Sequence, residues 1–367
     1  MDSKNLIKND DDPPGSSNAF QKEDISVKAQ ESQKTGDSFF IGKKFKIVVT
    51  FNYHNEKYGF VSAEFDTPET ISLIKTDIEK LGHKVYLVEA DENFYENLKK
   101  LKEKNEVDLV FNYSVGIYGR GRETHIPAFC EMLRIPCASS DAITTAFCQD
   151  KAKANDLLNY YGIKAPNHQL FKDPEEKLNK KINFPLIIKY VYQGSSIGLK
   201  DNKGVVNNEL ELYQRIKLLY KESPQTIMAE EYIKGREFTV GFYGNYPNVT
   251  FFPLVEMLPT KNQDPNIWVF NSHLQPVLNN VSIDKKIKEK IYKTIRKVVE
   301  IFELKDWGRI DLRVREKDSE VYILEINNCA HLSKTSVYFA GAKALGLSHE
   351  QLIVNMLNSA LKRYNLT

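Results

Sequence analysis

From residue 45 onward, short apolar runs alternate with longer amphipathic stretches. The run FKIVVTF (45–51) is apolar and β-branched, as in a buried parallel strand. The stretch TPETISLIKTDIEKLG then predicts a helix, because Thr67 can cap its start, Pro68 suits its first turn and Gly82 can end it. Its apolar positions share one face: Ile71, Ile74, Ile78 and Leu81.

The same alternation continues toward residue 139. KVYLVEA and VDLVFNY are predicted strands, with a helical stretch around ENLKKLKEK between them. Alternating strands and helices imply crossover connections and a parallel sheet. An N-terminal parallel α/β domain is therefore expected over residues 43–139, after a polar tail at 1–42 that has too few apolar residues to form a core.

The pattern changes near residue 140. A single helix is expected over roughly 140–161, followed by PLIIKYVYQGSSIGLK and TIMAEEYIKGREFTVGFYG, which suggest a central antiparallel α+β domain over 140–240. WGRIDLRV and EVYILEINN are expected at the centre of the sheet of a third α+β domain, 241–367, which closes with the helix GLSHEQLIVNMLNSALKRY. The fold class is thus α/β with three domains.

Composition and charge limit the kinds of binding partner that the sequence predicts. A net charge of +2 gives no overall field that favours nucleic acid or membrane as a partner. The four cysteines show neither a CxxC spacing nor a His/Cys cluster, so we expect reduced thiols rather than a zinc site or disulfides. No apolar stretch approaches the roughly 20 residues of a membrane helix, and the first residues lack the apolar part of a signal peptide. We therefore expect a cytosolic protein.

Three segments carry candidate chemistry. In the first, YQGSSIG (192–198) follows a strand that contains Lys189, and its small residues would let backbone N–H groups approach phosphate oxygens. Ser195 and Ser196 add hydroxyl donors. A plain Gly/Ser hairpin loop is the structural alternative.

The second segment is AEEYIKGRE (229–237). A carboxylate at its end could accept both ribose hydroxyls, and backbone groups near Tyr232 and Ile233 could pair with the edge of an adenine. A solvated run of charges at a strand end is the alternative.

The third segment combines Arg309, Asp311, Glu325 and Asn327. Arg309 and Asp311 share one face of a strand, and so do Glu325 and Asn327, because side chains alternate between faces. Two carboxylates and an amide supply the hard oxygen ligands that Mg²⁺ prefers, and burying them without a cation would be costly. Arg309 could neutralise a transferring phosphoryl group.

These motifs, in this order, resemble the ATP-grasp superfamily, and more closely the D-alanine–D-alanine ligases. The resemblance is carried by Asp150-Lys151, IIKYVYQGSSIG, EEYIKGREFTV, WGRIDLRV, LEIN and the GLSHEQLI helix. It implies a three-domain ATP-grasp architecture with ATP between the central and C-terminal domains, and two Mg²⁺ ions that Mn²⁺ could replace. The implied roles are as follows: Lys151 and Lys189 on the phosphates, Ser195 and Ser196 in the loop over them, Glu230, Tyr232 and Ile233 around the adenine, Glu237 on the ribose, Asp311, Glu325 and Asn327 on the metal, and Arg309 on the tetrahedral intermediate.

The substrate side departs from that family. The acid expected to hold the donor's ammonium group is Glu64 or Asp66, with Glu64 preferred and a solvated loop carboxylate as the alternative. Ser336 matches the serine that holds the acceptor carboxylate, but Ala330-His331 replaces the family's Pro-Gly and Lys334 adds a charge. The family's mobile Lys-Tyr pair is also unmatched, with Lys261 or His273 as substitutes.

Two arginines complete the candidate substrate residues. Arg120 and Arg122 follow a parallel strand, where open α/β sheets place ligands, and either could bind a substrate carboxylate. A solvated basic loop is the alternative.

The expected function is an ATP- and Mg²⁺-dependent ligase that joins a carboxylate to an amine through an acyl-phosphate. Its expected partners are small amino-acid or peptide substrates, with neither nucleic acid nor membrane, and a homodimer by resemblance. The substitutions suggest that the acceptor is not D-alanine. The alternatives are a ligase for a peptide or carrier-bound amine and, in another class, a nucleotide-binding regulator without turnover.

Overall fold

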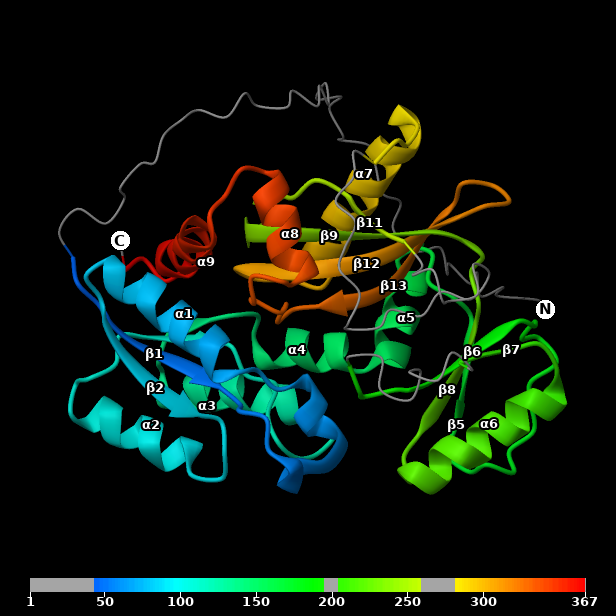
Figure 1. Cartoon of the computed structure of the whole chain (residues 1–367), viewed down its shortest axis with the longest axis horizontal. Helices are drawn as coiled ribbons and strands as arrows, with labels where there is room; N and C mark the ends of the chain where they lie inside the picture. Colours follow the sequence, from blue (N-terminus) through cyan, green and yellow to red (C-terminus); the bar gives the residue numbers. More distant parts are fainter. Residues whose placement is uncertain (1–42, 195–203, 259–280, 367) are drawn as a thin grey trace, which may run out of the picture. The chain divides into compact units, whose positions relative to one another are not determined.

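The computed structural model describes residues 43–194, 204–258 and 281–366. The predicted tail at 1–42, the serines Ser195 and Ser196, and Lys261 and His273 lie outside the described residues. Figure 1 shows the elements discussed below, which group into three sheets.

The first sheet is parallel, as predicted. It contains β1 (Lys46–Phe51), β2 (Lys84–Glu89), β3 (Leu109–Asn112) and β4 (Cys137–Ala138), in the order β2-β1-β3-β4. Helices α1 (Pro68–Lys80), α2 (Phe94–Glu103) and α3 (His125–Leu133) and the 3-10 segments η1 (Glu56–Glu64) and η2 (Arg122–Thr124) connect the strands. Thr67 caps α1 and Gly82 follows it with φ of 83°, a conformation that favours glycine.

The second sheet is antiparallel, as predicted for the central part of the chain. It contains β5 (His168–Phe171), β6 (Leu186–Tyr190), β7 (Val205–Val206) and β8 (Ile227–Glu231), in the order β5-β8-β6-β7. Helix α6 (Glu209–Glu222) lies along it (Figure 1) and buries Leu212, Ile216 and Leu219 at helical spacing against the strands.

The third sheet is also antiparallel and holds an extensive hydrophobic core. It contains β9 (Gly235–Asn245), β10 (Asn248–Phe251), β12 (Trp307–Arg315) and β13 (Val321–Asn327), in the order β10-β9-β12-β13, with β11 (Val255–Met257) paired to β9. Helix α7 (Lys285–Ile301) buries Ile291, Ile295 and Val298 in this core. The expectation that both WGRIDLRV and EVYILEINN are central is wrong for the second, because β13 is an edge strand of this sheet.

The predicted helix over 140–161 is two helices, α4 (Ala142–Gln149) and α5 (Lys151–Tyr160). Asp150 at the junction has φ of −88° and ψ of 92°, outside the helical region, and its side chain caps the N–H of Lys153 at 3.0 Å. The break turns Lys151 into the first residue of a new helix. Ala154 and Leu158 of α5 pack into the core of the third sheet.

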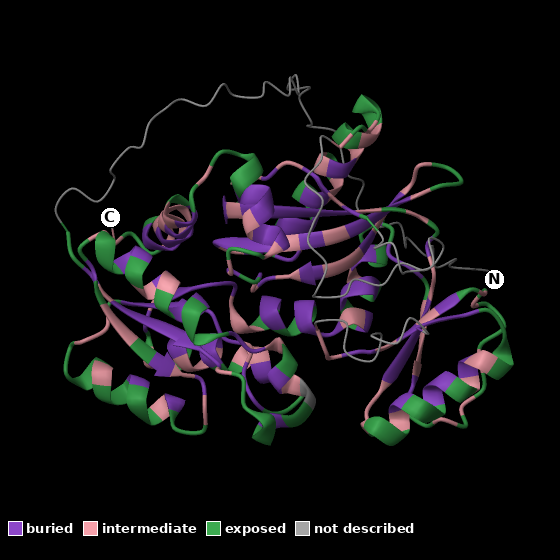
Figure 2. Cartoon of the chain, viewed as in Figure 1, coloured by how far each residue is buried: buried purple, intermediate pink, exposed green. Residues whose placement is uncertain are grey.

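Two further helices close the chain, α8 (Val337–Ala344) and α9 (His349–Arg363). The predicted start of the last helix is confirmed, because Ser348 forms a capping box with Gln351. The predicted boundary at residue 240 falls within β9, which pairs with β12 along its length. Figure 2 shows buried residues concentrated on β1, β9 and β12, with exposed residues on the outer faces of α2 and α6.

Candidate active site

A cavity of about 410 Å³ is lined by residues of the second and third sheets and by residues that follow β1 and β3 of the first sheet, such as Asn52 and Tyr113. Most of the predicted site residues line it: Glu64, Lys151, Lys189, Glu230, Tyr232, Ile233, Glu237, Arg309, Asp311, Glu325, Asn327, His331 and Ser336. Arg120, Arg122 and Lys334 do not. Residues more than 270 positions apart in the sequence therefore share one pocket.

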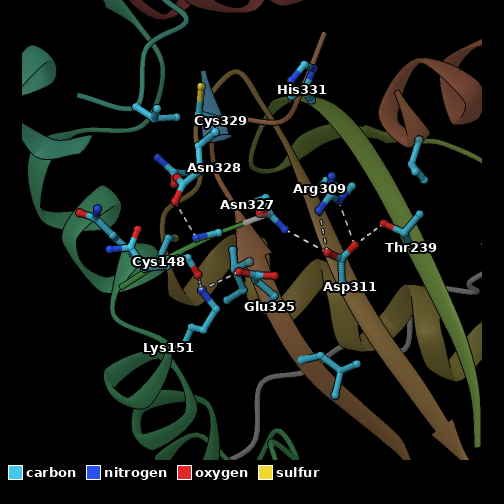
Figure 3. A pocket seen from close by; sticks show the side chains of 18 of the residues that line it. Cys148, Lys151, Thr239, Arg309, Asp311, Glu325, Asn327, Asn328, Cys329 and His331 are labelled. Carbon is cyan, nitrogen blue, oxygen red and sulfur yellow. Dashed lines mark hydrogen bonds and ion pairs between the residues drawn. The ribbon is translucent and has the colours of Figure 1, made fainter. Parts of the chain in front are cut away.

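Strands β12 and β13 present the acidic residues. Asp311 lies opposite Glu325, and Arg309 opposite Asn327, in the antiparallel register. Arg309 donates from Nε to Asp311 Oδ1 at 2.9 Å and from Nη2 to Oδ2 at 2.8 Å, and Asn327 Nδ2 donates to Oδ2 at 3.0 Å. Thr239 Oγ1 also donates to Oδ1 (Figure 3). Every predicted member of this set is thus in contact with Asp311 or directly across from it.

Lys151 connects α5 to the acidic set. Its Nζ lies 2.9 Å from Glu325 Oε1 and donates to the carbonyl of Gln193 at 2.8 Å (Figure 3). Burial alone would lower the pKa of Lys151, but Glu325 and, further off, Glu64 and Glu123 hold that pKa above its usual value. Lys151 is therefore a positively charged group held in place by Glu325 and by the backbone of Gln193.

The segment after the central sheet is ordered by two more ion pairs. Lys189 Nζ lies 3.0 Å from Glu230 Oε1, while Asn155 donates to Glu230 Oε2 at 3.0 Å. Glu237 accepts two hydrogen bonds from Arg313, at 2.8 and 2.6 Å. The guanidinium of Arg313 also lies 4.6 Å above the ring of Tyr232. The solvated charge run considered for this segment is thus wrong for Glu230, which is buried.

Arg313 is a site residue that the sequence reasoning missed. It lies two positions beyond Asp311 and lines the same cavity. Its Nη1 donates to the carbonyl of Ile233 at 3.1 Å, which fixes the backbone proposed to face an adenine. The available signal was the spacing of Arg309, Asp311 and Arg313 at alternate positions of one strand.

The two N-terminal arginines lie outside the set of residues that line the cavity. Arg122 is 1% exposed; its Nη2 donates to Glu64 Oε2 at 2.6 Å and its Nη1 to the carbonyl of Tyr192 at 2.8 Å. It is committed to these internal partners and does not line the cavity. Arg120 is exposed, pairs with Asp150 at 3.2 Å and lies above the ring of Tyr192. A substrate-binding role for either arginine stays a prediction.

Glu64 is not the solvated loop carboxylate considered as its alternative. It ends η1, its side chain is 7% exposed, and its Oε1 accepts the N–H of Gly194 at 2.8 Å. Glu123, next to Arg122, was passed over as a site residue although it lines the cavity. Burial, opposed by Arg122, raises the pKa of Glu123 to about 7.

The segment 328–336 carries the remaining predicted residues. Ser336 lines the cavity and caps α8 by accepting the N–H of Phe339 at 3.1 Å. His331 lines the cavity as well, while Lys334 is exposed and does not line it. Cys329 adjoins the acidic set, but burial raises the pKa of its thiol far above the usual value, which leaves it protonated and unreactive.

The acidic set has the chemistry of a magnesium site. Among residues 43–194, 204–258 and 281–366 there is no cluster of three His, Cys, Asp or Glu side chains that could hold a metal ion. The set here consists instead of two carboxylates facing each other across β12 and β13, with the amide of Asn327 beside Asp311. Three hard oxygen ligands of this kind fit Mg²⁺, which usually keeps several waters and is completed by substrate phosphates.

A parallel α/β domain followed by two antiparallel sheets is the arrangement of the ATP-grasp fold. Solved structures share the fold. The D-alanine–D-alanine ligase from Bacillus anthracis complexed with ATP aligns with a TM-score of 0.67 at 18% identity, covering 88% of this chain and 99% of that one. The VanG D-Ala:D-Ser ligase from Enterococcus faecalis aligns with a TM-score of 0.67 at 21% identity, covering 87% and 100%.

Residues 156–358 match the family model described as D-ala D-ala ligase C-terminus. This match spans more than half of the chain, which therefore belongs to the D-alanine–D-alanine ligase family and is an ATP-dependent, amide-forming ligase. The D-alanine–D-alanine ligase of Aquifex aeolicus is 29% identical over 280 residues, covering 75% of this chain and 89% of the relative. Within the described ranges, no helix is long and apolar enough to cross a membrane.

Proposed function

We propose that the chain joins the carboxylate of one amino acid to the amine of a second amino acid or peptide, through an acyl-phosphate made with ATP. The observation that supports this proposal is the pairing of Arg309 with Asp311 and of Lys151 with Glu325 in one cavity. A protein that only bound nucleotide would not need this complete set of phosphate-neutralising cations beside metal-binding acids.

In this proposal the nucleotide lies between the second and third sheets. Lys151 and Lys189 bind its phosphates, and the hydroxyls of Ser195 and Ser196, which lie outside the described residues, are proposed as further donors to them. Backbone groups near Tyr232 and Ile233 face the adenine, and Glu230 helps to order that wall of the pocket. Glu237, held by Arg313 at 2.6 Å, accepts the ribose hydroxyls.

Asp311, Glu325 and Asn327 would hold Mg²⁺, with Mn²⁺ as a substitute. Such an ion neutralises the phosphate oxygens and so assists transfer of the γ-phosphoryl group. The protein's own contribution is to orient the reactants. Arg309 breaks its ion pair with Asp311 and binds the transferring phosphoryl group, while Lys151 binds the neighbouring phosphate.

The reaction proceeds in two balanced steps. The donor carboxylate attacks the γ-phosphorus of ATP, forming an acyl-phosphate and releasing ADP. The acceptor amine then attacks the acyl carbon, a C–N bond forms, the C–O bond to phosphate breaks, and one proton is released. Arg309 stabilises the negative charge on the tetrahedral intermediate, and Glu64 lies beside the donor at the start of the Gly/Ser segment.

We further propose that the acceptor differs from D-alanine. His331 stands where the family has a glycine; its side chain is 45% exposed and lines the cavity together with Ser336. An imidazole there takes up space in which a small acceptor would otherwise meet the backbone. The structural neighbour described as a D-Ala:D-Ser ligase is in keeping with different acceptors on this fold. A homodimer and a cytosolic location stay predictions.

The deciding experiment measures ADP release and product mass with ATP, Mg²⁺ and a panel of amino acids in D and L forms. We expect one donor–acceptor pair to stimulate ADP release well above background. The mass of its product should equal the sum of the donor and acceptor masses minus one water. Efficient formation of D-alanyl-D-alanine from D-alanine alone would contradict the acceptor proposal. Nucleotide binding with no ADP release from any pair would contradict the ligase proposal.

A further inference from the structure

Asp66 lies at the carboxyl edge of the parallel sheet, between η1 and α1. Its backbone N–H donates to the carbonyl of Asn52 at 3.1 Å, and it forms an isolated parallel bridge with Tyr53 just beyond β1. Open α/β sheets bind their ligands at this edge. Asp66 lines the cavity together with Asn52 and Tyr113, which follows β3 at the same edge.

The Asp66 carboxylate is buried and incompletely satisfied. Its residue is 8% exposed, yet among the described residues its Oδ1 has no hydrogen-bond partner. His331 Nε2 lies 3.4 Å from this oxygen, a distance at which the contact is electrostatic when the ring is protonated. Burial raises the pKa of Asp66, while His331 and the hydroxyls of Tyr113 and Thr70 oppose that rise. A buried carboxylate oxygen without a donor is costly, so this one is suited to a cationic ligand.

Glu64, two residues earlier, is already satisfied. One of its carboxylate oxygens accepts from Arg122 Nη2 at 2.6 Å and the other from the N–H of Gly194 at 2.8 Å. A ligand ammonium group at Glu64 would have to compete with a buried guanidinium. Of the two acids before α1, Asp66 is the one that keeps an oxygen without a donor in the cavity.

The surroundings of Asp66 belong to the acceptor side. Tyr113, which supports its carboxylate, accepts the N–H of Leu332 at 2.9 Å, so the segment 328–336 is fastened to this edge of the sheet. The Tyr113 hydroxyl is also 3.5 Å from His331 Nδ1. In Figure 3, His331 lies at one end of the labelled side chains and Lys151 at the other. Lys151, which is proposed to bind the nucleotide phosphates, is thus separated from His331 by the rest of the labelled set.

We propose that Asp66 is the binding residue for the amino group of the acceptor and takes up its proton. This inference rests on the proposed ligase function. The ammonium group binds at Oδ1 and transfers one proton to the carboxylate. The free amine then attacks the acyl carbon: the C–N bond forms, the C–O bond to phosphate breaks, and the second nitrogen proton passes to the departing phosphate. His331 is a positioning residue: its ring restricts the acceptor to molecules whose amine reaches Asp66.

Hydroxylamine separates the two half-reactions. It is a small neutral nucleophile that traps an acyl-phosphate as a hydroxamate without needing an ammonium site. Asp66→Asn and wild-type protein are compared for ADP release, hydroxamate formation from D-alanine or the best donor of the panel, and amide formation with the matching acceptor. The control is Asp156→Asn, an exposed carboxylate on α5 whose side chain is 59% exposed.

We expect Asp66→Asn to lower the ratio of amide to hydroxamate at least about tenfold, as loss of one charge-assisted hydrogen bond predicts. The KM for the acceptor should rise while the KM for ATP changes little, and Asp156→Asn should keep the wild-type ratio. An unchanged ratio in Asp66→Asn would overturn the assignment and leave the ligase proposal intact. Wild-type protein that gives neither hydroxamate nor amide with any amino acid would overturn both.

His331→Gly tests the positioning role with the same assay. We expect it to admit acceptors that the wild type rejects, seen as new product masses, while hydroxamate formation from the donor keeps the wild-type rate. An acceptor range identical to that of the wild type would overturn the role given to His331.

Discussion

Arg309 and Asp311, two residues apart on β12, form a bidentate ion pair with N···O distances of 2.9 and 2.8 Å. The residue proposed to bind the transferring phosphoryl group therefore neutralises the residue proposed to bind the metal. Each must exchange this partner for a ligand when nucleotide binds.

The first prediction concerns Asp311→Asn. The amide cannot supply the negative charge that a divalent cation requires, so we expect turnover to fall by at least about a thousandfold, measured as ADP release. Asp318→Asn is the matched control, because Asp318 pairs in the same bidentate way with Arg315 on this sheet but is exposed. Turnover of Asp311→Asn near the wild-type rate would refute the metal assignment.

The second prediction concerns Lys151→Met. The methionine keeps the apolar stem but removes the cation that pairs with the half-buried Glu325 at 2.9 Å. It also removes a proposed ligand of the phosphates. We expect the KM for ATP to rise at least about tenfold. Lys164→Met, which removes an exposed lysine paired with Glu320 at 3.2 Å, serves as the control. Equal KM values for the two variants would argue against a phosphate role for Lys151.

The third prediction contrasts two arginines that the sequence treated alike. Arg122→Met leaves the Glu64 carboxylate buried without its guanidinium, and removing one partner of a buried pair costs about 3–5 kcal/mol. Arg120→Met removes a side chain that is 69% exposed, for which roughly 0–1 kcal/mol is expected. Urea unfolding of both variants measures the difference. A loss below about 1 kcal/mol for Arg122→Met would contradict the structural role.

The fourth prediction concerns pH and Glu123. Burial raises the pKa of this carboxyl from 4.5 to about 7 in the folded protein. The folded state then holds a proton that the unfolded state has lost, so stability falls as pH rises from about 4.5 to about 7 and is not regained above that range. We expect Glu123→Gln to remove roughly 1–3 kcal/mol of this fall.

Urea unfolding without nucleotide, at intervals from pH 5 to pH 8, measures that slope. Glu103→Gln, at the exposed end of α2, is the control and should keep the wild-type pH dependence. Parallel slopes for wild type and Glu123→Gln would show that Glu123 titrates normally.

The sequence predicted those parts of the site that follow from the alternation of side chains along a strand. Arg309 with Asp311, and Glu325 with Asn327, share faces for that reason. The cross-strand pairing of Asp311 with Glu325 could not be derived, because it depends on register, and a β-bulge shifts that register between Asp311 and Leu312.

Other features depended on tertiary partners that no local pattern reveals. Arg122 follows a strand, as ligand-binding residues of open α/β sheets do, but it donates its hydrogen bonds to Glu64 and to the carbonyl of Tyr192. The helix break at Asp150 was missed because the apolar spacing continues across it, although an Asp before a new helical turn is a capping signal. Asp66 was named but ranked second to Glu64, since only the structure shows which of the two has an oxygen without a donor.

The ion pairs around the cavity, Arg309–Asp311, Lys151–Glu325, Lys189–Glu230 and Arg313–Glu237, have a thermodynamic consequence. Each joins one positive and one negative group, so these four pairs together carry no net charge before a ligand binds. Binding of an anionic phosphate chain then replaces the carboxylates as partners of the lysine and arginine side chains. The carboxylates are left without their cationic partners. A divalent cation that binds those carboxylates restores the balance. Nucleotide and cation should therefore raise each other's affinity by the same factor, as any pair of linked ligands must.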